Sequence, residues 1–189
     1  MIIKNKADII KVINEDSWMI NILETVNLLN LPDWWICAGF IRSKIWDVQH
    51  QFSTRTPLPD IDVIYFDKDN TEELTEKEIE AKLYSLAPDI PWSVKNQARM
   101  HLKNDMPPYT SSIDGISKFP ETATALGVKL DHQSDVKLIA PWGVHDVVNL
   151  EVKPTPSFTS GNKIKIYQNR VREKEWNNTW KNIKIYEFG

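Results

Sequence analysis

The sequence contains a single cysteine, Cys37, among its 189 residues. An intrachain disulfide is therefore impossible, and a zinc site built from several cysteine thiolates is excluded as well. Cys37 follows Trp34, Trp35 and Ile36 and precedes Ala38, so its thiol falls inside an apolar run. A cysteine in such a run is usually a small hydrophobic residue rather than a nucleophile. We expect Cys37 to be buried and inert.

The sequence also lacks the short motifs that mark several common protein classes. It has no GxxxxGK[ST] phosphate loop, no GxGxxG dinucleotide fingerprint and no GxSxG nucleophile turn. Its histidines show neither HxxxH nor HExxH spacing, so a histidine-based zinc site is not indicated; they are His50, His101, His132 and His145. These absences argue against a P-loop protein, a Rossmann-type protein and a covalent hydrolase.

Long apolar runs are missing too. No stretch approaches the ~20 residues of a membrane-spanning helix, and the N-terminus MIIKNKADIIKVINED lacks the pattern of a signal peptide. We therefore expect a cytoplasmic protein with no membrane partner. The length suits one domain, with a core at about residues 30–102 and a C-terminal extension at about 103–189.

The net charge is only −3 at pH 7, but it is unevenly distributed. Residues 161–189 contain seven Lys/Arg and three Asp/Glu, a local excess of +4. The same segment holds Trp176 and Trp180, and a basic segment with aromatic residues can contact nucleic acid. The alternative, which we favour because the excess is small, is the solvated face of a terminal helix.

The most informative stretch is WICAGFIRSKIWDVQHQFSTRTPLPDIDVIYF, residues 35–66. It predicts a strand at 34–38, a turn at Gly39, a helix at 40–50, a proline-containing loop and a second strand at 61–66. Asp60 and Asp62 open the second strand and point to the same side of it, because side chains alternate along a strand. Two such carboxylates can hold a hard divalent cation. The alternative is a solvated pair at a strand edge.

Two further groups of polar residues are candidates for ligand binding. Arg42 and Ser43 begin a helix directly after Gly39, where free backbone N–H groups favour an anion; the alternative is an ordinary strand-to-helix turn. Residues 92–99 predict a third strand that is rich in polar donors. Its side chains can line a pocket and contact base, ribose or phosphate, or they can form the solvated face of an edge strand; the donors that we select are Lys95, Asn96 and Arg99.

The rest of the chain alternates helices and short strands. Apolar periodicity predicts helices at 5–14, 16–29, 71–86 and 162–176. A mostly loop segment with one helical turn is predicted at 103–120, and a β-hairpin at 126–130 and 135–140. A short helix or turn at 143–149, a brief strand at 150–153 and a short strand or tail at 183–188 are predicted to follow. This pattern predicts an α/β to α+β fold with a small mixed sheet flanked by helices, an added β-hairpin and a C-terminal helix.

The motifs AGFIRSKIWD and PDIDVIYFD resemble the nucleotidyltransferase superfamily of the DNA polymerase β type. In that superfamily a strand ends in a Gly-Gly or Gly-Ser turn, a helix follows, and the next strand carries Asp-x-Asp or Asp-x-Glu. The closer likeness is to the head domain of CCA-adding enzymes, whose Gly-Gly-x-Val-Arg-Asp compares with residues 38–43. The segments WSVKNQARMH, FPETATALGVKL, IAPWGVHD and KPTP resemble a small bacterial nucleotidyltransferase-like family, and this likeness covers most of the chain.

The resemblance implies a metal-dependent nucleotidyltransferase. It would transfer a nucleoside monophosphate from an NTP to a hydroxyl of RNA, protein or a small molecule, with Mg²⁺ or Mn²⁺ as cofactor. Asp60 and Asp62 would be catalytic and bind the metal, Gly39 would make room for the triphosphate, and Arg42 would neutralise it. Two alternatives remain: a catalytically weak or inactive nucleotide- or RNA-binding module, and a structural protein on the same fold.

Three departures from the family pattern bear on catalysis. Ala38 stands where the first glycine of the turn is expected, and Ser43 replaces the acid of the CCA-adding motif. A third carboxylate is not evident on the strand at 92–99, and Asp135 or Asp146 is a candidate for that role. Without a third acid, the site would bind a metal–nucleotide but transfer the nucleotide poorly.

Overall fold

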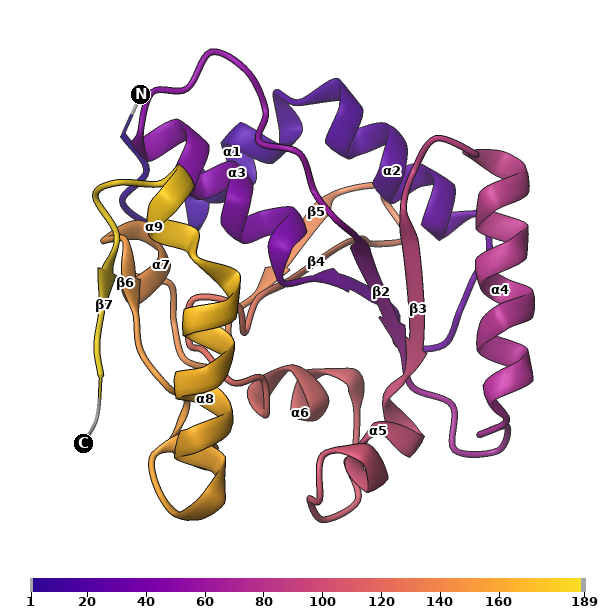
Figure 1. The fold of residues 1–189 in the computed structure, drawn as a ribbon. Coiled ribbons are helices and arrows are strands. Elements are labelled where there is room, and N and C mark those ends of the chain that lie inside the picture. Colours follow the sequence, from indigo (N-terminus) through magenta and orange to yellow (C-terminus); the bar gives the residue numbers. More distant parts are fainter. Residues whose placement is uncertain (1, 188–189) are drawn as a thin grey trace.

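The structure is a computed structural model and describes residues 2–187. A five-stranded mixed sheet lies at its centre (Figure 1), in the order β3-β2-β1-β4-β5. Strand β1 runs antiparallel to both β2 and β4, β2 runs parallel to β3, and β4 and β5 form a hairpin. The strands are β1 (Trp35–Cys37), β2 (Ile61–Tyr65), β3 (Trp92–Asn96), β4 (Gly127–Leu130) and β5 (Val136–Ile139). The pair β6 (Glu151–Val152) and β7 (Lys184–Ile185) forms a separate parallel sheet.

Helices surround the central sheet. They are α1 (Lys6–Asn14), α2 (Ser17–Asn27), α3 (Gly39–Gln49), α4 (Glu73–Leu86), α5 (Gln97–Lys103), α6 (Ser112–Ser117), α7 (His145–Val148), α8 (Gly161–Lys174) and α9 (Trp176–Thr179), with a 3₁₀ turn η1 (Pro156–Phe158) before α8. In Figure 1, α1 and α2 lie above the sheet and α6 lies below it. Between residues 2 and 187, no helix has the length and apolar composition needed to span a bilayer.

The predicted fold class is confirmed, because helices flank a mixed sheet and the hairpin and C-terminal helix are both present. One prediction is half wrong: the strand expected at 92–99 ends at Asn96. The Asn96 side chain accepts a hydrogen bond from the Ala98 N–H at 3.0 Å and caps the start of α5. The segment 103–120, expected to be mostly loop with one helical turn, contains the short helix α6. Of the tail expected at 183–188, the structure has β7, and residue 188 lies outside the described residues.

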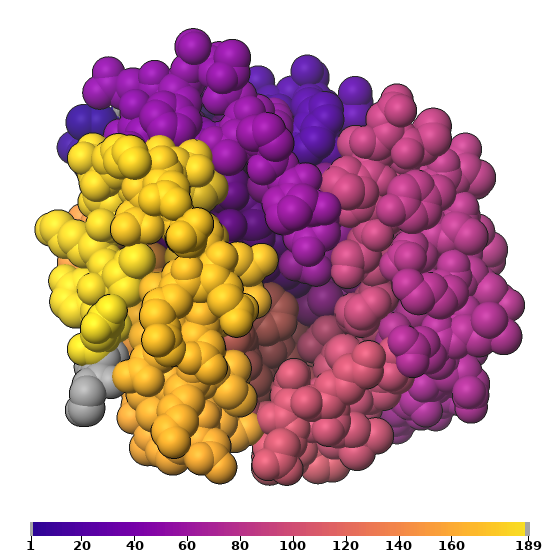
Figure 2. All heavy atoms as spheres, in the orientation of Figure 1, coloured from indigo at the N-terminus to yellow at the C-terminus, as the bar shows by residue number. Residues whose placement is uncertain are grey.

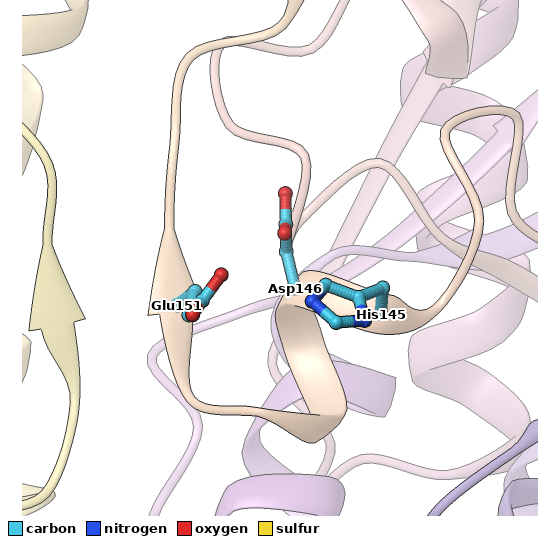
Figure 3. Close-up of side chains that lie close together, drawn as sticks. All are labelled: His145, Asp146 and Glu151. Atoms are coloured by element: carbon cyan, nitrogen blue, oxygen red, sulfur yellow. The ribbon is translucent and has the colours of Figure 1, made fainter.

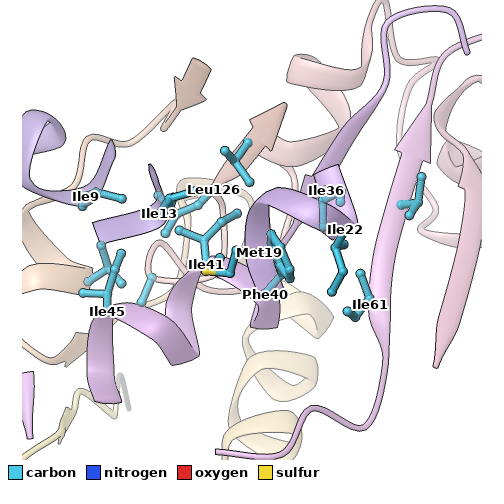
Figure 4. Close-up of a cluster of buried hydrophobic side chains, with 14 of the residues drawn as sticks. Ile9, Ile13, Met19, Ile22, Ile36, Phe40, Ile41, Ile45, Ile61 and Leu126 are labelled. Atoms are coloured by element: carbon cyan, nitrogen blue, oxygen red, sulfur yellow. The ribbon is translucent and has the colours of Figure 1, made fainter. Parts of the chain in front are cut away.

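The two faces of β2 carry different residues, and this separation sets up the site. Ile61, Val63 and Tyr65 are buried with the apolar side chains of α1, α2 and α3 in the main core, part of which Figure 4 shows. Asp62 and Ile64 therefore point to the opposite face. On that face a smaller apolar cluster contains Ile64 together with Trp35, Cys37, Ala38, Ile116 and Ala125. Asp62 thus lies on the side of the sheet that α1 and α2 leave uncovered.

Candidate active site

The turn after β1 and the first residues of β2 meet in space, as the sequence predicts. The antiparallel register pairs Trp35 with Ile64 and Ile36 with Val63, so the next pair along it is Cys37 and Asp62. Cys37 is buried, and burial together with the nearby Asp62 charge raises the pKa of its thiol. A protonated, buried thiol is a poor nucleophile. The candidate reactive groups at this end of the sheet are therefore the carboxylates of Asp60 and Asp62.

Ala38 adopts an unusual backbone conformation at this turn. Its φ of 53° and ψ of −117° fall in a region of backbone conformation that residues other than glycine rarely adopt. The Ala38 carbonyl accepts hydrogen bonds from the N–H groups of Ile41 at 3.3 Å and Arg42 at 3.0 Å, so the strained residue also starts α3. Such a conformation costs about 1–3 kcal/mol. A glycine at this position would adopt it without that cost.

Two residues of the loop that precedes Asp60 form side-chain hydrogen bonds with neighbouring helices. The Asp47 carboxylate accepts hydrogen bonds from the Thr56 N–H at 2.9 Å and from its hydroxyl at 2.6 Å. The Arg55 guanidinium donates to both carboxylate oxygens of Asp16 at 2.7 and 2.6 Å. The segment that leads to the two carboxylates is thus fixed to α3 and to the start of α2.

The environment of Asp62 disfavours its negative charge. Burial and, to a smaller extent, the neighbouring Asp60 carboxylate raise its pKa to about 6, although Arg170 and Ser93 act in the opposite direction. Asp60 itself is exposed. Two adjacent carboxylates, one of them poorly hydrated, provide hard oxygen donors and an unfavourable repulsion that a divalent cation relieves. The donor set therefore fits Mg²⁺ or Mn²⁺.

A large cavity opens beside Asp62. It has a volume of about 910 Å³ and lies between the start of β2, the α5 region and α8, where the molecule is hollowed in Figure 2. Its charged lining is mostly basic, with acids represented by Asp62 and Asp105 and bases by Lys95, Lys103, Lys118, Lys163 and Arg170. Apolar lining comes from side chains such as Met100, Phe119, Phe158 and Ile166. An anionic ligand with an apolar part, such as a nucleotide, suits this lining.

Arg42 lies next to the turn, buried and incompletely paired. It is only 8% exposed, and its guanidinium carbon lies 5.1 Å from the Trp46 ring centre and 4.6 Å from that of Trp176. Its Nη2 is 3.4 Å from the Ser43 hydroxyl, and its Nε finds no hydrogen-bond partner among the described residues. Burial lowers its pKa to about 10. A buried guanidinium with an unpaired donor is a candidate for binding an anion, although Arg42 is not among the residues that line the cavity.

The predicted site residues separate into two groups. Asp62 and Lys95 line the cavity, Gly39 adjoins the lining residue Ala38, and Ser43 is buried behind the turn. Asn96 and Arg99 lie elsewhere: the Asn96 side chain is fully buried and bonds to the backbone of Asp67, Asn70 and Ala98. Arg99 donates from Nε and Nη2 to the buried Glu76 carboxylate at 2.7 and 2.8 Å. Both side chains therefore belong to the packing of α4, β3 and α5 rather than to the cavity.

Neither candidate for a third carboxylate lines the cavity. Asp135 is exposed at the hairpin turn, 3.7 Å from Lys137. Asp146 accepts hydrogen bonds from the Thr122 hydroxyl at 2.7 Å and from Lys153 at 2.9 Å. Asp146 does form a cluster with His145 and Glu151, shown in Figure 3, whose ligand atoms lie within 4.8 Å of one another. Lys153 also pairs with Glu151, so the lysine already neutralises these carboxylates.

Sequence reasoning missed two residues, Arg170 and Glu121. Arg170 lies on α8 and lines the cavity, and its Nε donates to the buried Glu121 carboxylate at 2.7 Å. A signal for Arg170 was available: it follows Lys163 by seven residues, so both fall on one helix face. Glu121 carried no such signal, since its partner is 49 residues away.

Comparisons with known proteins agree with this geometry. Residues 24–185 match the family described as Nucleotidyltransferase. The chain belongs to this family. A structure solved by NMR and described as revealing a CCA-adding enzyme head domain is 36% identical, with a TM-score of 0.86 over 98% of this chain and 97% of the other. No match was found among curated proteins.

CCA-adding enzymes share the fold of this nucleotidyltransferase family member at lower identity. The complex with ATP is 15% identical with a TM-score of 0.57, and the complex with CTP is 13% identical with the same TM-score. Each comparison covers 99% of this chain but only 44% of the enzyme. The chain thus spans less than half the length of these enzymes.

Proposed function

We propose that the protein is a nucleotidyltransferase that transfers a nucleoside monophosphate from an NTP to a hydroxyl acceptor, with Mg²⁺ or Mn²⁺ held by Asp60 and Asp62. The observation that carries this proposal is the position of Asp62. It opens β2 beside the turn that follows β1, it lines a basic cavity, and its pKa is raised to about 6 by burial and by Asp60. A site that disfavours its own negative charge is stabilised by a bound cation.

The residues around Asp62 have complementary roles in this proposal. The NTP would enter the cavity with its phosphates toward Asp62 and the adjacent Asp60, and Lys95 would add positive charge from β3. Arg42, which is buried on α3 with an unpaired Nε, would add a further positive charge. In the reaction, the acceptor oxygen bonds to the α-phosphorus, the bond from that phosphorus to the bridging oxygen breaks, and pyrophosphate leaves. The acceptor proton passes to solvent. Divalent ions held by Asp60 and Asp62 would supply positive charge that stabilises the charge developing on the reacting phosphate.

One observation favours a second candidate, a nucleotide- or RNA-binding module with little or no turnover. Within residues 2–187, the cavity lining contains no acid close to Asp62 that could act as a third metal ligand; the other lining acid is Asp105, beyond α5. The nearby Glu121 is fully buried and paired with Arg170. The same cavity that accepts an NTP for transfer would then retain it, and the acceptor would be a bound partner rather than a substrate.

Thermal unfolding with ligands tests the binding step common to both candidates. The wild-type melting temperature is measured with Mg²⁺ or Mn²⁺ plus each NTP, beside Asp60→Asn/Asp62→Asn. A ligand that binds only the folded state raises its stability, so we expect a metal-dependent rise that the double variant loses. Asp135→Asn serves as a control for the loss of a carboxylate on an exposed turn. No rise with any NTP in a folded protein would reject both candidates.

Turnover separates the two candidates. α-Labelled NTPs are incubated with Mg²⁺ and RNA, protein or small-molecule hydroxyl acceptors, and labelled product and pyrophosphate are measured. A nucleotidyltransferase forms product that disappears in Asp62→Asn. Tight NTP binding without product for any acceptor class would favour the binding module.

A further inference from the structure

Arg170 is the strongest unexplained feature of the cavity. Its side chain is 35% exposed, whereas the Glu121 carboxylate that it contacts is fully buried. Glu121 accepts from Arg170 Nε at 2.7 Å through one oxygen and from the Thr124 hydroxyl at 2.7 Å through the other. A buried carboxylate needs partners of this kind, since an unpaired one is costly. The Glu121 carboxylate therefore has a fixed orientation, and its contact with Nε fixes the orientation of the Arg170 guanidinium.

The contact with Glu121 uses only one edge of the Arg170 guanidinium. Within the described part of the chain, no hydrogen bond is formed by its two terminal nitrogens. Arg170 lines the same cavity as Asp62, and its charge acts on both Asp62 and Arg42. A planar fork of free N–H donors held in place beside a cation-binding carboxylate matches the geometry of a phosphate group.

We propose that Arg170, oriented by Glu121, binds the polyphosphate of the nucleotide, so that α8 from the C-terminal extension supplies part of the nucleotide site. This inference rests on the proposed function. Arg170 would contact the anion from α8 with its terminal nitrogens, and the buried Arg42, held between two tryptophan rings on α3 and α9, would add positive charge. Arg170 is thus a binding residue, and Glu121 is a positioning residue that acts through it.

Calorimetric titration with Mg²⁺ plus ATP, CTP or inorganic tripolyphosphate tests the assignment. Arg170→Lys keeps the charge that Glu121 needs but loses the fork, so we expect dissociation constants to rise at least about tenfold for all three ligands. Arg172→Lys is the matched control, because Arg172 is exposed on the same helix and bonds to Gln168 and Asn169. Its affinities should equal those of the wild type.

The results distinguish this inference from the proposed function. Wild-type protein that binds none of the three ligands would overturn both. Binding that depends on Asp62 but is unchanged in Arg170→Lys would overturn the inference alone. A loss for ATP and CTP without a loss for tripolyphosphate would place Arg170 against the nucleoside and reject the phosphate assignment.

A double-mutant cycle tests the role of Glu121. Glu121→Gln should weaken tripolyphosphate binding in the wild type and have no further effect in Arg170→Gln, because its influence passes through the arginine. An equal effect in both backgrounds would show that Glu121 is only structural. The double variant Glu121→Gln/Arg170→Gln leaves no lone buried charge, and its melting temperature without ligand verifies the fold.

Discussion

Replacing Asp62 by asparagine should make the protein more stable at neutral pH. The folded-state pKa of Asp62 is about 6, against an ordinary value of 3.8 for an aspartate in the unfolded chain. The folded state therefore binds the proton more tightly than the unfolded chain, and the stability linked to this group is full below pH ~4 and is lost as pH rises through about 6. A rise of this size in the pKa corresponds to about 3 kcal/mol in the free energy of unfolding. Above pH 7, Asp62→Asn should therefore raise the free energy of unfolding by up to that amount, because asparagine carries no charge.

Urea unfolding of wild type and Asp62→Asn at pH 4 and pH 7.5 measures this effect. We expect nearly equal free energies of unfolding at pH 4, where Asp62 is protonated, and a more stable variant at pH 7.5. Asp135→Asn controls for the loss of one negative charge and should show no such gain. A variant less stable than the wild type at pH 7.5, or a difference independent of pH, would refute the electrostatic account of Asp62.

Three other substitutions follow from the same structure. Ala38→Gly should stabilise the fold by about 1 kcal/mol in thermal or urea unfolding, because glycine adopts the φ of 53° without strain; a loss of stability would contradict this. Glu76→Gln should destabilise by about 3 kcal/mol, because it breaks the ion pair between the fully buried Glu76 carboxylate and the mostly buried Arg99; an unchanged unfolding midpoint would count against it. Gly39→Ala should leave the melting temperature nearly unchanged, because the added Cβ would meet its nearest neighbour, Arg42 Nη2, at an ordinary contact distance of 3.6 Å. The same substitution should weaken NTP binding in a calorimetric titration, and an unchanged affinity would show that the turn does not approach the ligand.

The central motif was predictable because its information is local. An apolar run, a glycine turn and an amphipathic helix lead to a second apolar run, and alternation along β2 separates Asp62 from Ile61 and Val63. The pairing of β1 with β2 then brings the turn and Asp62 together. The resemblance to nucleotidyltransferases rested on the same residues.

Residues whose roles depend on distant partners were not predictable in this way. Asn96 looked like a pocket residue in a strand, but its side chain satisfies backbone groups at Asp67 and Asn70 and starts α5. Polar residues that cap a helix and those that bind a ligand look alike in sequence. Arg170 and Glu121 are joined only by the folding of α8 against the cavity, so periodicity indicated a helix face but not its partner.

Counting bound Mn²⁺ by electron paramagnetic resonance would test the central claim most directly. Free Mn²⁺ is titrated with wild-type protein in the presence of a non-reactive NTP analogue, and then with Asp60→Asn/Asp62→Asn and with Asp146→Asn. Because Asp60 and Asp62 hold the ion in the proposed site, we expect nucleotide-dependent Mn²⁺ binding that the double variant loses and Asp146→Asn keeps. Mn²⁺ binding that survives in the double variant, or that is lost in Asp146→Asn, would contradict a metal–nucleotide site at Asp60 and Asp62.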